Sequence, residues 1–345
     1  MADTIGMAAQ AAGQAVRFGL YLGLNRLVDW RTNALGRAPA EKPRGRIPSQ
    51  AELLRDLMGV LMQDAAAVRD GLYPPMSDEP PLPVQLARIR DMLADLPSAL
   101  ARRNARDAST AENAERHDDL PDYFVQDFHF QTGGYLTNDS ARLYDLQVET
   151  LFYGAAGAMR RQALRPIAAF MHGRDQRQVR LLDVACGTGR FLRAVRLAYP
   201  AMKLSGLDLS RPYLDEARRH LKGLRPVEWI AANAESIPLP DASQDIVTTV
   251  FLFHELPPDV RRRVTAEMAR VLKPGGLLVF IDSLQMGDRP GWDGLLEAFP
   301  ARFHEPYYRH YAIDDLDGVF SEAGLEAAQQ ATVFLAKMMV RRKVG

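Results

Sequence analysis

A short glycine-rich segment follows an apolar run in the second half of this chain. Residues 181–190 are Leu-Leu-Asp-Val-Ala-Cys-Gly-Thr-Gly-Arg, a pattern that predicts a buried strand, a tight turn and the start of a helix. Glycine has no Cβ, so at Gly187 and Gly189 the backbone can approach a ligand closely and direct its amides towards it. Asp183, just before the turn, would repel a pyrophosphate and favours a cationic group such as a sulfonium or an amine. Leu192 occupies the place where a dinucleotide-binding turn has a small residue, which disfavours NAD.

Two further polar segments follow at the ends of predicted strands. Asp208 ends the run Leu204-Ser-Gly-Leu-Asp, where a carboxylate can accept hydrogen bonds from both hydroxyls of a ribose. Asn233 follows the third predicted strand, and its side chain can pair with the edge of an adenine. Capping of the next helix is the alternative for Asp208, and a turn role is the alternative for Asn233.

Together these segments make the sequence resemble the class I S-adenosylmethionine-dependent methyltransferases, and more closely the small-molecule branch that contains ubiquinone and menaquinone biosynthesis methyltransferases. The resemblance is strong from about Gln178 to Asp282, loose beyond that and absent from residues 1–120. Two positions differ, because Ala185 stands where glycine is usual and Asn233 where aspartate is usual. The matching segments are Asp183-Val-Ala-Cys-Gly-Thr-Gly, Gly206-Leu-Asp-Leu-Ser, Asn233-Ala-Glu-Ser-Ile-Pro-Leu-Pro, Phe253-His-Glu-Leu and Val271-Leu-Lys-Pro-Gly-Gly.

This resemblance implies that S-adenosyl-L-methionine is the cofactor. The glycine turn would hold its methionine part, Asp208 its ribose, and Asn233 with Ala234 its adenine. A nucleophilic Cys186 is the alternative to a small spacer in the turn. The predicted cofactor-binding residues are Asp183, Ala185, Cys186, Gly187, Thr188, Gly189, Asp208, Leu209, Asn233, Ala234 and Glu235.

Methyl transfer is an in-line displacement at an activated carbon, so the protein mainly aligns the acceptor and excludes water. A base is needed only when the acceptor must lose a proton. His254 follows the fourth predicted strand and is the first candidate for that base; a pocket-wall role is the alternative. Further candidate catalytic residues, for which core packing is the alternative, are Tyr135, Tyr144 and His304, with His129 and Asp127 treated in the same way.

The predicted activity is transfer of a methyl group to a small, apolar or aromatic acceptor, with O- or C-methylation favoured. Aromatic residues are frequent in 123–153 and 303–311, where they would surround such a molecule. A non-catalytic cofactor-binding or scaffold protein with the same fold is the first alternative. Other cofactor chemistry on this fold, including an NAD-dependent oxidoreductase, is the second.

The elements that must position these residues form an α/β pattern. Short apolar runs alternate with helical stretches, which predicts a Rossmann-like, doubly wound, seven-stranded and mostly parallel sheet with an extra N-terminal helical region. The last two strands are expected to form an antiparallel edge pair. The predicted strands are Val179–Ala185, Lys203–Leu207, Val227–Ala231, Asp245–Phe251, Gly276–Asp282, Leu325–Gln330 and Val333–Val340.

Three regions follow from these patterns. Residues 1–119 are expected to be an N-terminal helical region that ends in a polar linker from Arg102 to Asp119, with helices over 49–71 and 84–100. Residues 120–175 form an aromatic and helical lead-in that lies against the core, with one helical pattern from Ser140 to Met171. Residues 176–345 form the Rossmann-like domain.

Composition limits the partners of this chain. Lys plus Arg and Asp plus Glu both number 43, so no global positive charge attracts nucleic acid. The single cysteine provides neither a disulfide framework nor a thiolate metal site, and no metal is predicted. The expected partner is a small-molecule acceptor, and the expected location is cytoplasmic.

The N-terminal segment has no secretory signal pattern and no apolar run of membrane-spanning length. Val16, Leu20, Leu24 and Leu27 recur at helical spacing in a locally basic stretch. Packing of this helix on its own protein is the first interpretation. Homodimer formation, a substrate lid and peripheral contact with the inner face of a membrane are the other three.

Overall fold

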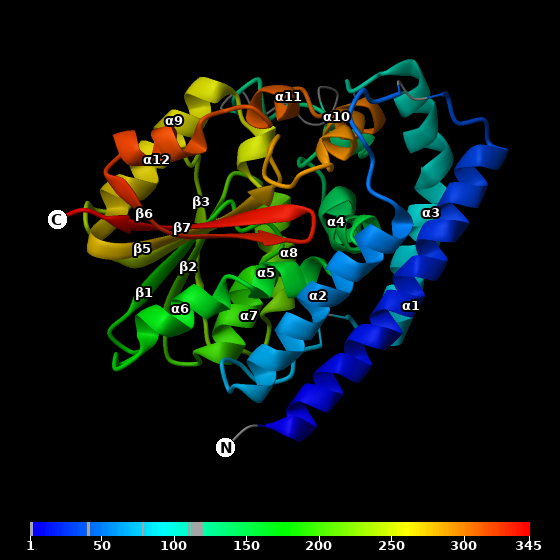
Figure 1. Ribbon diagram of the computed structural model, residues 1–345. Helices are drawn as coiled ribbons and strands as arrows, with labels where there is room; N and C mark the ends of the chain where they lie inside the picture. The colour runs from blue at the N-terminus through cyan, green and yellow to red at the C-terminus, as the bar shows by residue number, and fades with distance from the viewer. Residues whose placement is uncertain (1–2, 40–41, 78, 110, 112–119) are drawn as a thin grey trace.

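The computed structural model describes residues 3–39, 42–77, 79–109, 111 and 120–345. In these residues seven strands form one sheet in the order β3-β2-β1-β4-β5-β7-β6 (Figure 1). The first five strands in the chain are parallel, and β7 pairs antiparallel with β5 and β6. The predicted fold class is confirmed, including the antiparallel C-terminal pair. The strands are β1 Arg180–Val184, β2 Lys203–Asp208, β3 Glu228–Ala231, β4 Gln244–Val250, β5 Leu272–Ser283, β6 Leu325–Val333 and β7 Ala336–Lys343.

Helices cover both faces of the sheet because successive strand side chains point to opposite sides. Leu181 belongs to the core on one face and Leu182 to the core on the other. One face packs against α5 Ala156–Arg161, α6 Leu164–Met171, α7 Arg190–Ala198 and α8 Arg211–His220. The opposite face packs against α9 Pro258–Val271 and α12 Leu316–Glu322.

The N-terminal helices lie outside this layered core (Figure 1). The buried Asp64 of α2 ties them to it, because its carboxylate accepts from Arg161 Nε on α5 at 2.7 Å and from Gln10 Nε2 on α1 at 2.7 Å. An ion buried in this way is stable only with such partners. The three helices are α1 Thr4–Ala34, α2 Gln50–Arg69 and α3 Leu82–Ala105.

Helix α1 packs on its own chain through a different side from the predicted apolar stripe. Of that stripe, Leu24 is buried, whereas Val16, Leu20 and Leu27 are exposed. Within the described residues, no helix is both long and apolar enough to cross a membrane. The predicted linker 102–119 begins inside α3, and its residues 110 and 112–119 lie outside the described residues.

Several boundaries differ from the sequence-based expectation. The helical pattern over 140–171 is three helices. The chain turns between α4 and α5 at Gly154, whose φ is 79° and whose Cα lies too close to Tyr21 for a Cβ, and it turns again at residues 162–163 between α5 and α6. The fifth strand begins earlier than the predicted Gly276, because Lys273-Pro-Gly-Gly lies within β5 beside a register shift opposite Gln244. A turn at Phe334, with φ of 57°, separates the last two strands slightly later than predicted.

The carboxyl ends of β1, β2, β4 and β5 meet segments that come from both halves of the chain. Helix α4 begins at the capping residue Thr137, and the short helix η3 follows β4 directly. Side chains from the lead-in and from the C-terminal half therefore converge at this edge. The segments are η2 Phe128–Phe130, α4 Asn138–Leu151, η3 Phe253–Glu255, α10 Asp293–Arg302 and α11 Tyr308–Tyr311.

Candidate functional site

The glycine turn joins β1 to α7. Gly187 and Gly189 have φ of 53° and 73°, and a Cβ on Gly187 would meet no atom within 4 Å. A Cβ on Gly189 would come within 3.0 Å of the Ala217 side chain, so close helix packing requires glycine there. Ala185 also has a positive φ, 55°, a conformation that costs a residue with a Cβ about 1 to 2 kcal/mol. The turn thus keeps a glycine-like backbone where alanine replaces the usual glycine.

Asp208 is the last residue of β2, and its carboxylate faces the turn. Oδ2 accepts from the Gly187 amide at 2.7 Å, and Oδ1 accepts from the Ser210 amide at 2.8 Å. Each oxygen keeps a second lone pair. Burial raises the pKa of Asp208 to about 6, although the Ser210 and Gly187 amides lower it. Among the described residues no arginine or lysine forms a salt bridge with it, so its charge is available to a ligand.

Asp183 lies inside β1 and is almost completely buried. Its Oδ1 accepts a hydrogen bond from the Thr248 hydroxyl on β4 at 2.6 Å. Burial raises the pKa of Asp183 to about 7; the Thr248 bond lowers it, and the nearby Asp208 carboxylate raises it further. A cation bound at the ends of these strands would stabilise the ionised form of both carboxylates.

The third predicted cofactor segment, which begins at Asn233, contacts Tyr123, a residue that the sequence did not indicate as its partner. Asn233 Nδ2 donates to Glu235 Oε1 at 3.1 Å, and Asn233 Oδ1 accepts from the Glu235 amide at 2.9 Å. The Tyr123 hydroxyl donates to Glu235 Oε1 at 2.6 Å and lies 3.5 Å from Asn233 Oδ1. Asn233 is therefore close to Tyr123 rather than open to the cavity.

The other predicted cofactor residues lie around the same turn. Cys186 is buried, its amide donates to Leu207 O at 2.9 Å, and burial raises the pKa of its thiol well above the usual range. A thiol held protonated in this way suits a spacer better than a nucleophile. Thr188 turns away from the strand ends, since its hydroxyl donates to Asp145 Oδ1 at 2.7 Å. Leu209 follows β2 directly, and Ala234 packs against the core under α9.

The turn and Asp208 border a small cavity, which we call the strand-end cavity. Its volume is about 90 Å³, below the roughly 300 Å³ at which ligand pockets usually begin. Aromatic rings fill its outer side: the Tyr135 ring lies 5.4 Å from Phe128 and 5.3 Å from Tyr213. The cavity is lined by Tyr123, Phe124, Phe128, Tyr135, Tyr144, Ala185, Gly187, Asp208, Ser210, Tyr213, Val250, Phe251, Leu252, Glu255 and Leu256.

A second space, the apolar cavity, adjoins the first. It measures about 320 Å³, which is large enough for a small organic molecule. Tyr144, Phe251 and Glu255 line both cavities. Its walls come from α2, α4, α10 and the β6–β7 turn, and they are mostly apolar, with the candidate base His254 at one end. The strand-end cavity therefore has residues suited to a cofactor, and the apolar cavity has the volume and the lining suited to an acceptor.

His254 is held in a fixed orientation. Its Nδ1 lies 2.5 Å from Asp282 Oδ1, at the end of β5. Burial lowers the pKa of His254, but the Asp282 carboxylate outweighs that effect and the pKa is raised overall. The Asp282 Oδ2 atom accepts the Phe253 amide at 2.6 Å, which fixes the short helix that holds the imidazole. Nε2 is left facing Glu255, whose Oε1 is 3.7 Å away.

The remaining candidate residues separate into two groups. Tyr135 and Tyr144 line the strand-end cavity, and the Tyr135 hydroxyl donates to Glu255. His304 does not belong to the described residues that line the two cavities. Its Nε2 lies 2.8 Å from Gln126 Oε1. Its neighbour Glu305 instead points towards His129 and His254. Glu255, Asp282 and Glu305 were missed as site residues, although each adjoins a candidate histidine in sequence or ends a predicted strand.

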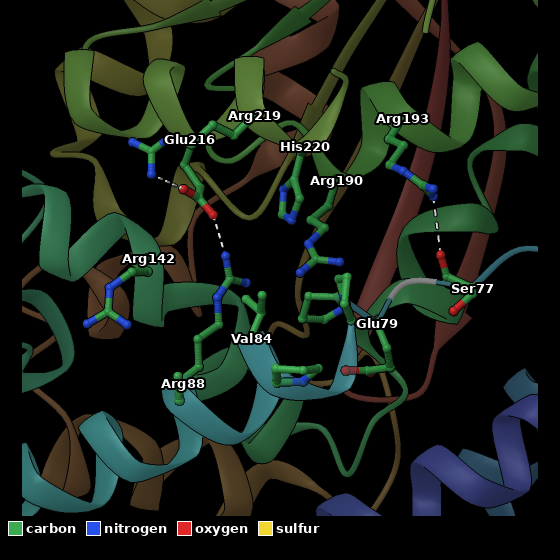
Figure 2. Close-up of a pocket in the computed structure, with 14 residues that line it drawn as sticks. Ser77, Glu79, Val84, Arg88, Arg142, Arg190, Arg193, Glu216, Arg219 and His220 are labelled. Carbon is green, nitrogen blue, oxygen red and sulfur yellow. Dashed lines mark hydrogen bonds and ion pairs between the residues drawn. The ribbon is translucent and has the colours of Figure 1, made fainter. Parts of the chain in front are cut away.

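A larger cavity of about 640 Å³, which we call the arginine cavity, lies between α3, α7 and α8 (Figure 2). Neither the glycine turn nor Asp208 lines it. The buried Arg88 pairs with the buried Glu216, Arg219 also contacts Glu216, and Arg193 donates to Ser77 O at 3.2 Å. Since its buried charges, Arg88 and Glu216, are paired with each other, this cavity has the character of an interface between helices.

Comparison with known proteins agrees with the strand-end geometry. A family model described as a methyltransferase domain matches residues 181–276, which include the glycine turn, Asp208 and Asn233. The resemblance to S-adenosylmethionine-dependent methyltransferases is confirmed. The matched part ends within β5 and contains His254 and Glu255, but not Asp282, Glu305 or the helices of residues 1–119.

Two curated relatives carry names from quinone biosynthesis. Demethylmenaquinone methyltransferase of Listeria welshimeri is 38% identical over 129 residues, which cover 36% of this chain and 53% of the relative. A ubiquinone/menaquinone biosynthesis C-methyltransferase of Methylobacterium nodulans is 31% identical over 165 residues, covering 47% of this chain and 63% of the relative. The chain thus spans about half to three fifths of the length of these relatives.

Solved structures match a similar part of the chain. A SAM-dependent methyltransferase of Aquifex aeolicus has 22% sequence identity and a TM-score of 0.39, covering 53% of this chain and 93% of that protein. A SAM-dependent methyltransferase of Methanosarcina mazei has 20% identity and a TM-score of 0.41, covering 51% and 97%.

Proposed function

We propose that this protein transfers a methyl group from S-adenosyl-L-methionine to a small acceptor held in the apolar cavity. The observation that carries the proposal is the arrangement at the sheet edge. Asp183 and Asp208, two buried carboxylates without arginine or lysine partners among the described residues, flank an open glycine turn beside a chamber of suitable size. A cationic sulfonium nucleoside has the charge and the hydroxyl groups that such an edge binds.

The residues present fit that cofactor in chemistry. Gly187 leaves open space where a side chain would obstruct the methionine part, and Asp208 keeps free lone pairs for ribose hydroxyls. Asp183 supplies negative charge near the sulfonium and amino groups. Asn233, Ala234 and Glu235 remain the proposed adenine contacts, with Tyr123 as the residue that must release Asn233 first.

The small volume of the strand-end cavity means that loading requires movement of the aromatic lead-in. Phe124 and Phe128 each stack on Tyr135, and all three rings line the cavity. Their displacement by a few ångströms would open the strand ends, and their return would exclude water from the bound ligands. Closure of this kind is a common way to protect a transfer reaction from solvent.

The chain's own residues then align the acceptor. The bound cofactor supplies a methyl carbon activated by its sulfonium. Tyr144 and Phe251, which line both cavities, place the acceptor between the chamber and the strand ends. His254 Nε2 faces the same junction and can accept a proton from an acceptor hydroxyl or carbon acid, while Asp282 holds its Nδ1. A pocket-wall role for His254 is the alternative.

The lining of the apolar cavity supports an apolar or aromatic acceptor. Leu53, Val148, Phe299 and Leu335 form much of its wall. The relatives' names, with demethylmenaquinone and ubiquinone or menaquinone biosynthesis, make a quinone-type molecule the first acceptor to test. O-methylation and C-methylation both fit this chamber.

Calorimetric titration of the purified chain with S-adenosylmethionine and S-adenosylhomocysteine tests the cofactor assignment, with NAD as the control. Binding of the first two alone supports the proposal and justifies a screen with a labelled methyl group and quinone-type acceptors. Binding of the cofactor with no transfer to any acceptor would favour a scaffold protein. No binding at all would contradict the assignment.

In this proposal residues 1–119 form a helical region, residues 120–175 an aromatic lead-in and residues 176–345 the catalytic domain. One side of α1 also offers a docking surface. Five large apolar side chains that are each at least 40% exposed fall on an arc of roughly 80° of the helix: Ile5, Val16, Leu20, Leu27 and Trp30. Peripheral membrane contact and homodimer formation are the two proposed uses.

Sedimentation with anionic vesicles and the molecular mass in solution distinguish these two uses. The variant Leu20→Ser/Trp30→Ser should lose vesicle binding in the first case and become monomeric in the second, with no change in cofactor affinity. A wild-type protein that is monomeric and does not bind vesicles would remove both.

A further inference from the structure

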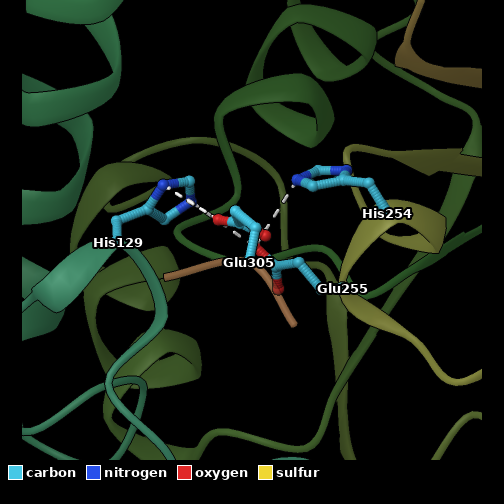
Figure 3. A group of neighbouring side chains, drawn as sticks. All are labelled: His129, His254, Glu255 and Glu305. Atoms are coloured by element: carbon cyan, nitrogen blue, oxygen red, sulfur yellow. Dashed lines mark ion pairs between the residues drawn. The ribbon is translucent and has the colours of Figure 1, made fainter. Parts of the chain in front are cut away.

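Four side chains from three distant segments converge beside the apolar cavity (Figure 3). His129 comes from η2, His254 and Glu255 come from η3, and Glu305 lies between α10 and α11. One potential ligand atom from each residue lies within 4.8 Å of those of the other three. The spacing of these four residues in the sequence does not predict that their side chains meet.

We propose that His129, His254, Glu255 and Glu305 bind one divalent first-row transition-metal ion. Two imidazoles with two carboxylates form a mixed nitrogen and oxygen ligand set, which suits zinc, iron, cobalt or manganese. Magnesium and calcium prefer sites built of oxygen ligands alone. The set therefore selects the class of cation by its chemistry.

The first supporting observation is the partner of His254. Metal-binding histidines usually donate the second ring N–H to a carboxylate, which fixes the tautomer and aims the other nitrogen at the ion. Asp282 Oδ1 lies 2.5 Å from His254 Nδ1, so the Nε2 atom is the one directed into the cluster. Asp282 is itself held by the amides of Leu252 and Phe253 at 3.1 and 2.6 Å.

The second supporting observation is the state of Glu305. Its side chain is completely buried, and neither carboxylate oxygen has a hydrogen-bond partner among the described residues. Oε1 lies 3.0 Å from His129 Nδ1, which forms an ion pair with it only when the imidazole is protonated. A buried carboxylate without hydrogen bonds is costly unless it is neutralised or bound to a cation.

The charge balance of the cluster points the same way. Three carboxylates, those of Glu255, Asp282 and Glu305, face two imidazoles. The guanidinium of Arg261 donates its hydrogen bonds elsewhere, to Asp314, Phe253 O and Tyr307 O. A divalent cation would offset two of these three negative charges.

Binding needs only a small contraction of the cluster. Bonds of about 2.0 to 2.2 Å to nitrogen and oxygen place opposite ligand atoms roughly 4.4 Å apart at most, and the four ligand atoms already lie within 4.8 Å of one another. His129, His254 and Glu255 all line the apolar cavity, so coordination positions not used by the protein would face it. If the proposed methyl transfer holds, on which this step rests, the ion would bind an oxygen of the acceptor, and His254, whose Nε2 is then a metal ligand, would not act as the base.

The test uses the full chain after treatment with a chelator. Titration with Co²⁺, followed by visible absorption and calorimetry, should give one ion per chain and the spectrum of cobalt bound by nitrogen and oxygen. Glu305→Gln and His129→Gln should each weaken Co²⁺ binding by at least about 100-fold, and Asp282→Asn by about 10- to 100-fold. His172→Gln, which changes an exposed histidine outside the cluster, should bind cobalt like the wild type.

Binding of S-adenosylhomocysteine to each metal-free variant serves as the separate readout of folding and of the cofactor site. Retained cofactor binding with lost cobalt binding supports the metal site. Absence of stoichiometric cobalt binding by the wild type overturns it, even where cofactor binding is normal. Equal cobalt affinity in Glu305→Gln, His129→Gln and the wild type overturns it as well. Failure of cofactor binding alone would count against the proposed function and leave the cobalt result to decide the metal site.

Discussion

The arginine cavity and the carboxyl edge of the sheet both place charged groups in partly enclosed spaces, but they treat those charges differently. In the arginine cavity, Glu216 is buried against Arg88 and also contacts Arg219. At the sheet edge, Asp183, Asp208 and Glu305 are buried with no arginine or lysine salt bridge among the described residues. Their pKa values are raised by burial to about 7, 6 and 8, respectively.

We interpret the paired charges of the arginine cavity as contacts that hold helices together, and the carboxylates at the sheet edge as groups that bind a ligand. A paired charge stabilises the fold only with its partner, so its removal should be felt in stability. An unpaired buried carboxylate is already unfavourable for the fold, so it is expected to matter for binding. The larger cavity is therefore the structural one, and the smaller spaces at the strand ends are the functional ones.

The largest expected effect tests the structural side of this comparison. Arg88→Met should lower the free energy of unfolding by about 3 kcal/mol, because Glu216 would be left buried with only the largely exposed Arg219 beside it. Urea denaturation measures the change. Arg90→Met, which alters an exposed arginine of the same helix, is the control. Similar stability of the two variants would contradict a structural role for the buried pair.

The next effect tests the functional side. Asp208→Asn should weaken binding of S-adenosylmethionine by about 1 to 3 kcal/mol, or roughly 5- to 150-fold, because charge-assisted hydrogen bonds to the ribose are lost. Calorimetry measures it, with Asp215→Asn on the exposed side of α8 as the matched control. An unchanged affinity would refute the ribose assignment.

The pH dependence of cofactor binding sharpens the same point. Asp208 and Asp183 must be ionised to attract a cationic ligand, and their pKa values in the free protein are about 6 and 7. Affinity should therefore begin to fall as the pH drops below about 7 and fall more steeply below about 6. Titrations at several pH values check this. Asp208→Asn should remove the steeper part, and a wild-type affinity independent of pH over this range would contradict the raised pKa values.

The smallest effect concerns Tyr123. Tyr123→Phe removes the hydroxyl that contacts Asn233 and donates to Glu235, so an adenine has one competitor fewer there, although the hydrogen bonds between Asn233 and Glu235 remain. A net hydrogen bond of about 0.5 to 1.5 kcal/mol corresponds to a roughly 2- to 10-fold gain in cofactor affinity. Tyr199→Phe, at the C-terminal end of α7, should show no gain. Weaker binding by Tyr123→Phe would instead identify the hydroxyl as a ligand contact.

Much of the fold follows from local pattern. The five parallel strands, the glycine turn and the C-terminal antiparallel pair were predicted because strand burial and turn chemistry depend on neighbouring residues. Asp183 and Asp208 were found as candidates for the same reason, since each lies at a fixed offset from a strand end. Exceptions arose where distant packing intervened, as at Gly154, where contact with Tyr21 of α1 breaks the helical pattern.

The relation between the aromatic lead-in and the strand ends could not be predicted in this way. Tyr123 precedes Asn233 by more than one hundred residues, and the contact between them depends on how the lead-in folds over the sheet. The apolar stripe of α1 shows the same limit. Helical spacing predicted the stripe, but the tertiary structure decided that Leu24 is buried while Val16, Leu20 and Leu27 are exposed.

The sequence by itself determined the class of fold, the cofactor-type turn and the acidic residues at the ends of β1 and β2, because these depend on periodicity and short spacing. Only the tertiary structure decided that His129, His254, Glu255 and Glu305 meet around one point with Asp282 behind them. Their convergence requires the closing of loops from three parts of the chain. No local pattern encodes the distance between side chains that are brought together only when the whole core is packed.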